Sequence, residues 1–340
     1  MGTKKQPPSA LRIVDIARLA GVAPITVSRV LNQPEQVKPA TRERVQKAIA
    51  KTGFVPNQNA GALASKRSRL VAVVLPMLTN PLFSETFQAI TERLAQSGYQ
   101  VLLGVAGYET RQEQELLDLI LSRRPDGIIL TGTFHSDACR QRLRAMHIPV
   151  VETWDVSDDP IDMLVGFSHR EVGIATADHL LAQGYQRFGV LSVDDPRGLL
   201  RAQALVETLR NRGITDISEH YFSGQPTLAQ GREGLLRIRQ QDALPRVIVC
   251  TSDTIAQGVL TEAASVGLTV PGEVAVFGFG DMNFAAHTWP PLSTVRIDGR
   301  LIGEQSASAL LQRLSGENES NFRLDVGFTL IDRGTTSKLS

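Results

Sequence analysis

The chain has 340 residues, of which 42% are hydrophobic, enough to bury a large core in two or three structural units. No stretch approaches the roughly 20 consecutive apolar residues of a membrane span, and the charged N-terminus lacks the apolar region of a secretory signal, so we expect a cytoplasmic protein without membrane contact. Two cysteines, Cys139 and Cys250, are too few for a disulfide framework and lack metal-ligand spacing, which predicts buried reduced thiols.

The formal net charge of +1 hides an uneven distribution of charge along the chain. Residues 1–69 carry 13 Lys and Arg against three acidic residues, whereas the remaining residues carry 23 basic and 32 acidic side chains. A basic segment of this kind is either a disordered solubilising tail or a module that binds a polyanion. The hydrophobic pattern decides between these alternatives.

The basic segment carries three apolar stripes at helical spacing. They predict one helix that stops at Gly21, a second that begins at Pro24, and a third from Thr41 to Gly53. The apolar positions are Ile13, Ile16, Ala17 and Ala20, then Val27, Val30 and Leu31, then Val45, Ala48 and Ile49. Three short helices around a small core indicate an all-α helix-turn-helix domain at residues 1–55, since a disordered tail would not carry these stripes.

The second of these helices is the one that we expect to read double-stranded DNA. The N-terminal residues of a helix in the major groove reach base edges, so Arg29 is suited to a bidentate pair with guanine and Ile25 to the methyl group of thymine. The alternative is a three-helix protein-interaction module in which Arg29 is merely solvated. The expected DNA contacts on this helix are Pro24, Ile25, Thr26, Ser28, Arg29 and Asn32.

From Leu70 onward, short apolar runs alternate with amphipathic helical stretches in two blocks. The first block contains LVAVVL, VLLGVA, GIILT and IPVVE, and the second contains FGVLSV, VIVCT and VAVFGF. This alternation predicts an α/β core of two doubly wound lobes with parallel sheets. Ligands of such sheets bind beyond the carboxyl ends of the strands, so we expect the site residues in the loops that follow these runs.

Motifs for an enzyme are weak in this sequence. The stretch GFGDMN has two of the three glycines of a dinucleotide fingerprint, no P-loop occurs, and GFSHR lacks the last glycine of a nucleophile elbow. We therefore expect a protein that is not an enzyme and that holds no metal or cofactor. A solute-binding protein of a transporter would share the lobed core, but it would need a signal peptide and no basic head.

Two long stretches resemble the DNA-binding head and hinge of the LacI/GalR repressor family. They are IVDIARLAGVAPITVSRVLN and VKPATRERVQKAIAKTGFVPNQNAGALASKRS, and the likeness continues through DGIIL, HLLAQGYQRFGVL, EAASVGLTVPGEVAVFGFGD and PPLSTV. The resemblance implies a helix-turn-helix domain followed by a periplasmic-binding-protein-like core. Family members usually have Ser or Thr at the position of Ala23 as the cap of the recognition helix, so we expect this helix to depend more on DNA for its order.

The resemblance also implies that residues 56–69 form a hinge that becomes helical on the operator. In this hinge Asn57 begins the helix, Ala60 contacts DNA, and Leu63 wedges between base pairs in the minor groove. Gly61 and the short length disfavour the helix without DNA and a partner hinge, which fits this role, whereas the alternative is a plain linker.

The effector site implied by the resemblance lies in a core of residues 70–340. Lobe 1 would comprise about residues 70–165 and 295–324, and lobe 2 about residues 166–294 and 325–340. The register leaves Trp154 or Asp155 as alternatives at one position, and Gly280 or Asp281 at another. The expected effector-binding residues are Leu82, Phe83, Ser84, Thr131, Trp154, Asp155, Arg201, Ser252, Asp281 and Arg296.

Two departures from the family pattern indicate the charge of the effector. Sugar-binding relatives usually have Asn at the position of Ser252 and Asp at that of Gly280. A site that lacks the carboxylate but keeps Arg201 favours an anionic ligand, because a guanidinium offers a forked pair of donors to a carboxylate. The alternatives are an interlobe salt bridge for Arg201 and ordinary core packing for Phe83.

Further stretches, among them LPMLTNPLFSE, GYETRQEQELLDLILS and DGIILTGTFH, are similar to the gluconate operon repressor branch of the family. We therefore expect a repressor of sugar acid catabolism genes that responds to gluconate or 2-ketogluconate, with a neutral sugar or another metabolite as the alternative. A homodimer would match a pseudo-palindromic operator. The final residues contain no heptad extension, which favours a dimer over a tetramer built on C-terminal helices.

Overall fold

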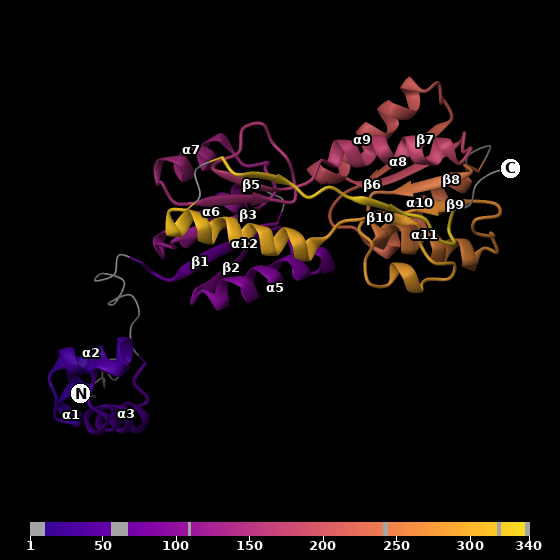
Figure 1. Ribbon diagram of the computed structural model, residues 1–340. Helices are drawn as coiled ribbons and strands as arrows, with labels where there is room; N and C mark the ends of the chain where they lie inside the picture. Colours follow the sequence, from indigo (N-terminus) through magenta and orange to yellow (C-terminus); the bar gives the residue numbers. More distant parts are fainter. Residues whose placement is uncertain (1–10, 56–66, 108–109, 241–243, 318–320, 337–340) are drawn as a thin grey trace, which may run out of the picture. The chain divides into compact units, whose positions relative to one another are not determined.

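The computed structural model describes residues 11–55, 67–107, 110–240, 244–317 and 321–336 (Figure 1). The chain divides into two compact units, Met1–Ser68 and Arg69–Ser340, which we call the head and the core. The expected hinge contacts Asn57, Ala60 and Leu63 lie outside the described residues. Among the residues that are described, no helix combines the length and apolar character that a bilayer crossing requires.

The head contains the three expected helices. They are α1 (Ile13–Ala20), α2 (Pro24–Asn32) and α3 (Pro39–Thr52), with a 3-10 turn η1 (Pro34–Gln36) before the third. The helix expected from Thr41 begins two residues earlier, because Pro39 suits the first helical position, where its missing N–H has no partner to lose. Gly21 and Gly53 end their helices in the left-handed conformation, with φ of 63° and 62°, as the sequence predicts.

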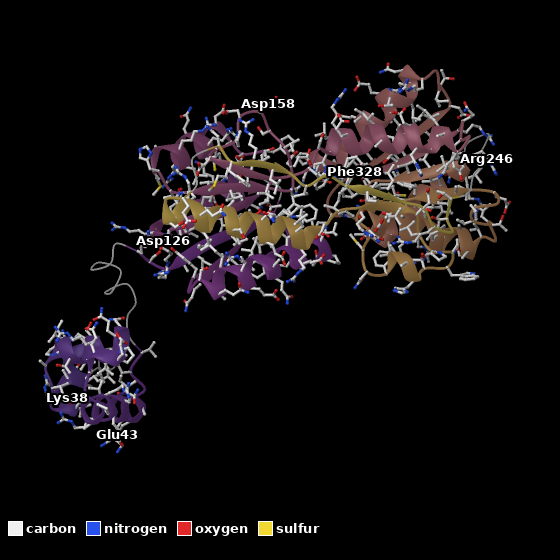
Figure 2. The ribbon with its side chains drawn as sticks, in the orientation of Figure 1. Lys38, Glu43, Asp126, Asp158, Arg246 and Phe328 are labelled. Carbon is white, nitrogen blue, oxygen red and sulfur yellow. The ribbon has the colours of Figure 1, made fainter. Side chains whose placement is uncertain are left out.

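A small apolar core holds the three helices of the head together. Its buried members are Ile16, Ala17, Ala20, Val27, Val30, Val45, Ala48 and Phe54. The other expected stripe residues, Ile13, Leu31 and Ile49, are partly buried and pack against this cluster, so the helical pattern in the sequence is confirmed. Charged side chains such as Lys38 and Glu43 are exposed on the outside of the head (Figure 2).

The first lobe of the core is a six-stranded parallel sheet in the order β11-β5-β4-β3-β1-β2. Its strands are β1 (Leu70–Leu75), β2 (Gln100–Val105), β3 (Gly127–Thr131), β4 (Val150–Thr153), β5 (Met163–Gly166) and β11 (Arg323–Asp325). Its helices are α5 (Pro81–Gln96), α6 (Thr110–Ser122), α7 (Asp137–Ala145) and α12 (Gly299–Ser315). Successive residues of β1 enter separate apolar clusters, Val71 and Val73 in one and Ala72 and Val74 in the other, because the sheet is covered on both faces.

The second lobe is a four-stranded parallel sheet in the order β7-β6-β8-β9. Its strands are β6 (Phe188–Val193), β7 (Ile217–Phe222), β8 (Val247–Cys250) and β9 (Ala275–Phe277). Its helices are α8 (His169–Ala182), α9 (Pro196–Asn211), α10 (Leu228–Arg239) and α11 (Asp253–Ser265), with a 3-10 turn η2 (Ala285–His287). The helices α8 and α9 pack closely at Gly173, where a Cβ atom would lie only 2.4 Å from the carbonyl oxygen of Arg201.

The chain passes between the two lobes more than once. It leaves β5 of the first sheet for α8, and it returns through β10 (Thr294–Arg296) to α12 (Figure 1). It then runs from β11 in the first sheet to β12 (Thr329–Ile331), which pairs antiparallel with β10. Two doubly wound parallel lobes are thus confirmed, and the two cysteines are buried free thiols as expected.

Candidate functional site

A pocket of about 480 Å³ lies between the two lobes of the core, and we call it the cleft pocket. Its wall combines residues that follow strands of both sheets, such as Trp154 after β4 and Thr251 after β8, with the first turns of α5 and α9. This is the place where open parallel sheets bind ligands. The residues that line it are Asn80, Leu82, Phe83, Trp154, His169, Asp195, Arg197, Arg201, Pro226, Thr251, Ser252, Phe279 and Met282.

The wall from the first lobe is aromatic and rigidly held. Asn80 caps α5 by accepting a hydrogen bond from the backbone N–H of Leu82 at 3.1 Å, which places Leu82 and Phe83 in the first turn beside the pocket. The ring of Phe83 meets Trp154 edge to face, with centroids 5.2 Å apart. Trp154 has a φ of 66°, and its indole N–H donates to the hydroxyl of Thr86 at 3.1 Å. A non-glycine residue in this backbone region costs about 1–3 kcal/mol and is typical of functional sites.

The wall from the second lobe carries two arginines on one face of α9. Arg197 and Arg201 are four residues apart, so their side chains lie one above the other on the helix, and only 7% and 9% of the two residues are exposed. The guanidinium of Arg201 stacks on Phe279 at 3.8 Å from the ring centroid and donates to the carbonyl oxygen of Thr251 at 2.9 Å. The guanidinium of Arg197 lies 5.3 Å from the ring centroid of Phe83, so it contacts the opposite lobe.

His169 is a neutral member of this wall. Burial, and secondarily the nearby charges of Arg201 and Arg197, lower its pKa well below the ordinary value. Its Nε2 lies 2.8 Å from the carbonyl oxygen of Trp154, and its Nδ1 lies 2.8 Å from a guanidinium nitrogen of Arg201. Since the arginine can only donate, Nδ1 accepts and the proton of the neutral ring is on Nε2. The pocket therefore contains two fixed cations beside an uncharged imidazole.

Two carboxylates lie near these arginines, and both are held by other groups. Asp195 caps α9 and accepts from the backbone N–H groups of Arg197 and Gly198, each at 3.1 Å. Asp155 is 2% exposed and does not line the pocket, and its burial raises the pKa of the carboxyl although both arginines oppose that shift. The electrostatic balance of the pocket therefore favours an anion.

Five of the ten expected effector residues line the cleft pocket: Leu82, Phe83, Trp154, Arg201 and Ser252. Asp155 lies behind its wall, and Ser84 donates its hydroxyl to the carbonyl oxygen of Leu78 at 2.8 Å. Asp281 and Arg296 do not line the pocket, although Met282 beside them does. Arg296 donates to Asp281 at 2.6 Å, and the other carboxylate oxygen of Asp281 pairs with Arg333 at 2.7 Å.

Thr131 lines a second pocket, of about 520 Å³, at the carboxyl ends of β1, β2 and β3. We call it the switch-point pocket. Arg197 lines both pockets.

The reasoning from sequence missed several residues of the cleft pocket, notably Arg197, His169 and Phe279. The signal for Arg197 was present, because the run PRGLLRAQ places it one helical turn before Arg201. His169 had no local signal, since its role depends on the packing of α8 against α9.

The residues expected to contact DNA form one face of α2. Pro24, Arg29 and Asn32 are exposed, Thr26 and Ser28 are half-buried, and Ile25 is 60% exposed. The buried residues Val27 and Val30 lie on the other face of this helix. The N-cap residue Ala23 makes no side-chain hydrogen bond, as expected for alanine.

Comparison with known proteins gives matches along both units. Residues 12–57 match the model of the bacterial regulatory proteins of the lacI family, and residues 177–336 match the periplasmic binding protein-like domain. The HTH-type transcriptional regulator GntR of Pseudomonas aeruginosa is 36% identical over 325 residues, which cover 95% of this chain and 94% of that protein.

Solved structures agree with the sequence matches. A LacI-family transcriptional regulator from Silicibacter pomeroyi has a TM-score of 0.88 and 34% identity, covering 96% of this chain and 99% of that one. The lac repressor dimer bound to operator and the anti-inducer ONPF has a TM-score of 0.81 and 28% identity, covering 97% of this chain and all of that one. The chain belongs to the LacI family of bacterial transcriptional regulators, and it is a DNA-binding regulator rather than an enzyme.

Proposed function

We propose that this regulator represses genes of sugar acid catabolism and that a sugar acid, gluconate or 2-ketogluconate, controls its operator affinity from the cleft pocket. The observation that carries this proposal is the pair of buried guanidiniums, Arg197 and Arg201, beside the neutral His169. A carboxylate accepts paired N–H donors from such groups, and charge-assisted hydrogen bonds of this kind are about twice as strong as neutral ones. The similarity to regulators named GntR supports the same class of effector.

The remaining wall of the cleft pocket suits the hydroxylated part of such an acid. Asn80, Thr251 and Ser252 supply polar groups, while Phe83 and Phe279 supply flat apolar faces. Polar groups fix the orientation of a ligand in a largely apolar pocket. A neutral sugar would use these same groups but would gain nothing from the positive charge of the two guanidiniums.

For the DNA side, we propose the division expected from the sequence: a helix-turn-helix domain at residues 1–55, a hinge at 56–69 and a core at 70–340. The exposed face of α2, with Arg29 at its centre, would lie in the major groove. A homodimer, the state of the lac repressor bound to operator, would place two such helices on two half-sites. The proposed site of action is the cytoplasm, where operator DNA lies.

The effector can be tested by the fluorescence of Trp154. The chain has two tryptophans, and Trp289 is 93% exposed, so a Trp289→Phe background leaves the pocket tryptophan as the reporter. We expect gluconate or 2-ketogluconate to change its emission in a saturable way. Arg197→Gln and Arg201→Gln should each weaken binding by about 10- to 100-fold, since each removes a hydrogen bond from a charged donor.

The matched control is Arg212→Gln, which removes an exposed arginine just beyond α9 that pairs with Asp178. It should leave the affinity for the acid unchanged. Silence for both acids together with a response to glucose would show that the effector is a neutral sugar and would end the proposal.

Operator binding can be tested by gel shift with the DNA upstream of the gene for this chain. We expect one duplex to bind well above the others, and Arg29→Ala to abolish that preference, since a bidentate contact to guanine is worth about 1–3 kcal/mol. Lys47→Gln is the control, because it also removes one exposed positive charge but on α3, where Lys47 pairs with Glu43, and not on α2. Adding the acid should change the affinity about 5- to 150-fold. Equal weak binding to every duplex, unaffected by Arg29→Ala, would refute the proposal.

A further inference from the structure

The switch-point pocket lies at a distinctive place in the first sheet. Pro76, Ala106 and Thr131, which line it, stand at the carboxyl ends of β1, β2 and β3. Along the chain, β1 is followed by β2, its neighbour on one side in the sheet, and then by β3, its neighbour on the other side. The strand order therefore reverses at the carboxyl end of β1. Ligands of open α/β sheets bind in the crevice at such a reversal.

Arg197 connects the switch-point pocket with the cleft pocket. Its side chain reaches from α9 across to the end of β3, where its Nη1 would lie 3.2 Å from a Cβ atom at Gly132. The absence of a side chain at Gly132 therefore leaves room for the guanidinium. Because Arg197 lines both pockets, one ligand that contacts this arginine can extend into each of them.

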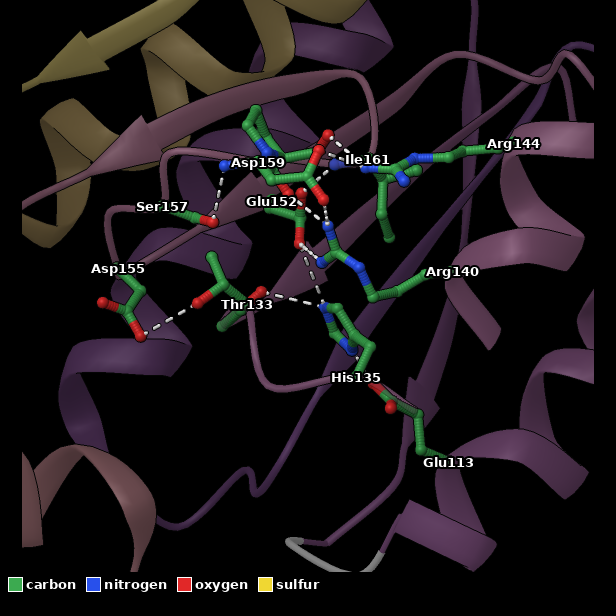
Figure 3. A network of polar contacts seen from close by, with 12 residues as sticks. Glu113, Thr133, His135, Arg140, Arg144, Glu152, Asp155, Ser157, Asp159 and Ile161 are labelled. Carbon is green, nitrogen blue, oxygen red and sulfur yellow. Dashed lines mark hydrogen bonds and ion pairs between the residues drawn. The ribbon is translucent and has the colours of Figure 1, made fainter. Parts of the chain in front are cut away.

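The far wall of the switch-point pocket carries a carboxylate, Glu113 of α6. Its Oε1 lies 2.8 Å from Nδ1 of His135, and Figure 3 shows the two side chains meeting end to end. Nε2 of His135 lies 3.0 Å from the carbonyl oxygen of Gly132 and 3.7 Å from Oε1 of Glu152. Both ring nitrogens thus face acceptors, an arrangement that an imidazolium satisfies by donating from each.

The contact with His135 determines which ligand groups Glu113 can bind. Burial lowers the pKa of His135, but the two carboxylates and the carbonyl oxygen of Gly132 outweigh it and raise the pKa overall, which favours the imidazolium form that the two flanking acceptors also suit. The imidazolium holds Glu113 in place, and 14% of the Glu113 side chain stays exposed. A carboxylate accepts hydrogen bonds and donates none, so it suits hydroxyl groups and opposes a second carboxylate.

We propose that the effector lies across both pockets, with its carboxylate against Arg201 and Arg197 and its hydroxylated tail against Glu113. This inference rests on the proposed function and narrows it to one chemical class: acyclic acids with a single carboxylate at one end and a polyhydroxyl chain at the other. Glu113 is a specificity residue that rejects diacids, and His135 is the positioning residue that holds it.

The wild-type protein tests this with three ligands in isothermal titration calorimetry at constant pH. Gluconate has the carboxylate and the full tail, glucarate carries a second carboxylate at the tail end, and threonate is a four-carbon acid with a shortened tail. We expect glucarate and threonate each to bind about tenfold or more weakly than gluconate, because one adds an acceptor opposite Glu113 and the other loses donors to it.

The variant Glu113→Gln sharpens the test. The amide oxygen still accepts from His135, while the amide nitrogen offers donors toward the pocket. We expect gluconate to bind about tenfold more weakly and the advantage of gluconate over glucarate to shrink by about tenfold or more. Threonate should bind the variant as it binds the wild type. Glu115→Gln, two residues away and exposed in its pair with Arg111, is the matched control and should change none of these ratios.

The outcomes separate this inference from the proposed function. If the wild type binds none of the acids, the proposed function fails and the inference fails with it. If the wild type binds gluconate but binds glucarate and threonate equally well, the effector class proposed above survives and the tail contact with Glu113 is refuted. If Glu113→Gln does not fold, as judged by circular dichroism, the wild-type ligand series alone decides.

Discussion

The head and the core begin their helices in different ways. In the core, α5, α7, α8, α9, α10, α11 and α12 each have an Asn, Ser, Asp or Thr at the N-cap whose side chain accepts a backbone N–H. In the head, α1, α2 and α3 follow Arg12, Ala23 and Lys38, and none of these N-cap residues accepts a backbone N–H with its side chain, although Asp15 in the first turn of α1 accepts the backbone N–H of Arg12 at 2.9 Å. A capping side chain contributes about 1 kcal/mol, so the head lacks stabilisation that the core has repeatedly.

The two units also differ in where their charges lie. All six histidines belong to the core, as do the buried carboxylates Glu152, Asp155, Asp253 and Glu262. In the head the ion pair of Lys47 with Glu43 is exposed. We therefore expect the pH dependence of stability to come from the core, and we expect the head, with its smaller apolar cluster, to open more easily. This difference can be tested one region at a time by hydrogen exchange, which reports local opening free energies.

The largest expected effect comes from the small apolar core of the head. Ile16 is fully buried in a cluster of eight buried residues, so Ile16→Ala leaves a cavity that little surrounding structure can fill. We expect a loss of about 2–5 kcal/mol, enough to unfold most of a small unit. Hydrogen exchange should show α1, α2 and α3 losing protection together, while the core keeps its protection.

Leu19→Ala is the control for this change, because Leu19 on the same helix is 59% exposed. It should alter protection in the head only slightly. Loss of protection in the core after Ile16→Ala would contradict the independence of the two units.

The next largest expected effect is on the way the free energy of unfolding of the core depends on pH. Burial raises the pKa of Asp253 to about 6, against the hydrogen bonds that its carboxylate accepts from Thr294 and Met282. The folded state therefore binds this proton more tightly than the unfolded state, and the free energy of unfolding falls as pH rises from about 4 to about 6. The expected loss across this window is about 3 kcal/mol, and Asp253→Asn should remove it.

Urea unfolding of the core at several pH values measures this slope. The variant also replaces a carboxylate that accepts from the N–H of Met282 with an amide, which can change the stability at every pH. The comparison therefore uses the change of the free energy of unfolding with pH and not its value at a single pH. Asp118→Asn, an exposed change on α6, is the control and should keep the wild-type slope. Parallel curves for wild type and Asp253→Asn would show that the buried carboxyl does not titrate in this window.

The sequence predicted most of the fold because local rules govern it. Apolar stripes, Gly21, Gly53 and Pro24 determine the helices of the head, and alternation of apolar runs with helical stretches determines the parallel lobes. The start of α3 lies two residues before the predicted one, because Pro39 occupies the first helical position and the apolar stripe begins only later in the helix.

The candidate site was predictable only in part because it depends on distant packing. Arg201 was expected, but the partners that orient it, His169 and Phe279, become neighbours only when α8 packs on α9 and the segment after β9 folds beside them. Arg296 was expected near the ligand, yet it lies beside Gly280 in a β-bridge and pairs with the next residue, Asp281. The sequence around each arginine does not show whether its side chain lines the pocket, as that of Arg201 does, or pairs with a carboxylate outside the lining, as that of Arg296 does.

The smallest expected effect comes from giving a head helix a capping side chain of the kind that the core helices already have. Ala23 precedes α2 with φ of −71° and ψ of 149°, the extended conformation of a capping residue, so Ala23→Ser can accept a backbone N–H without strain. We expect α2 to gain about 1 kcal/mol of protection in hydrogen exchange. The reciprocal change, Ser168→Ala at the N-cap of α8, should cost the core about the same amount and leave the head unchanged. If Ala23→Ser leaves the exchange of α2 unaltered, the missing cap does not limit the stability of this helix, and the small apolar cluster of the head is the remaining explanation for any lower protection.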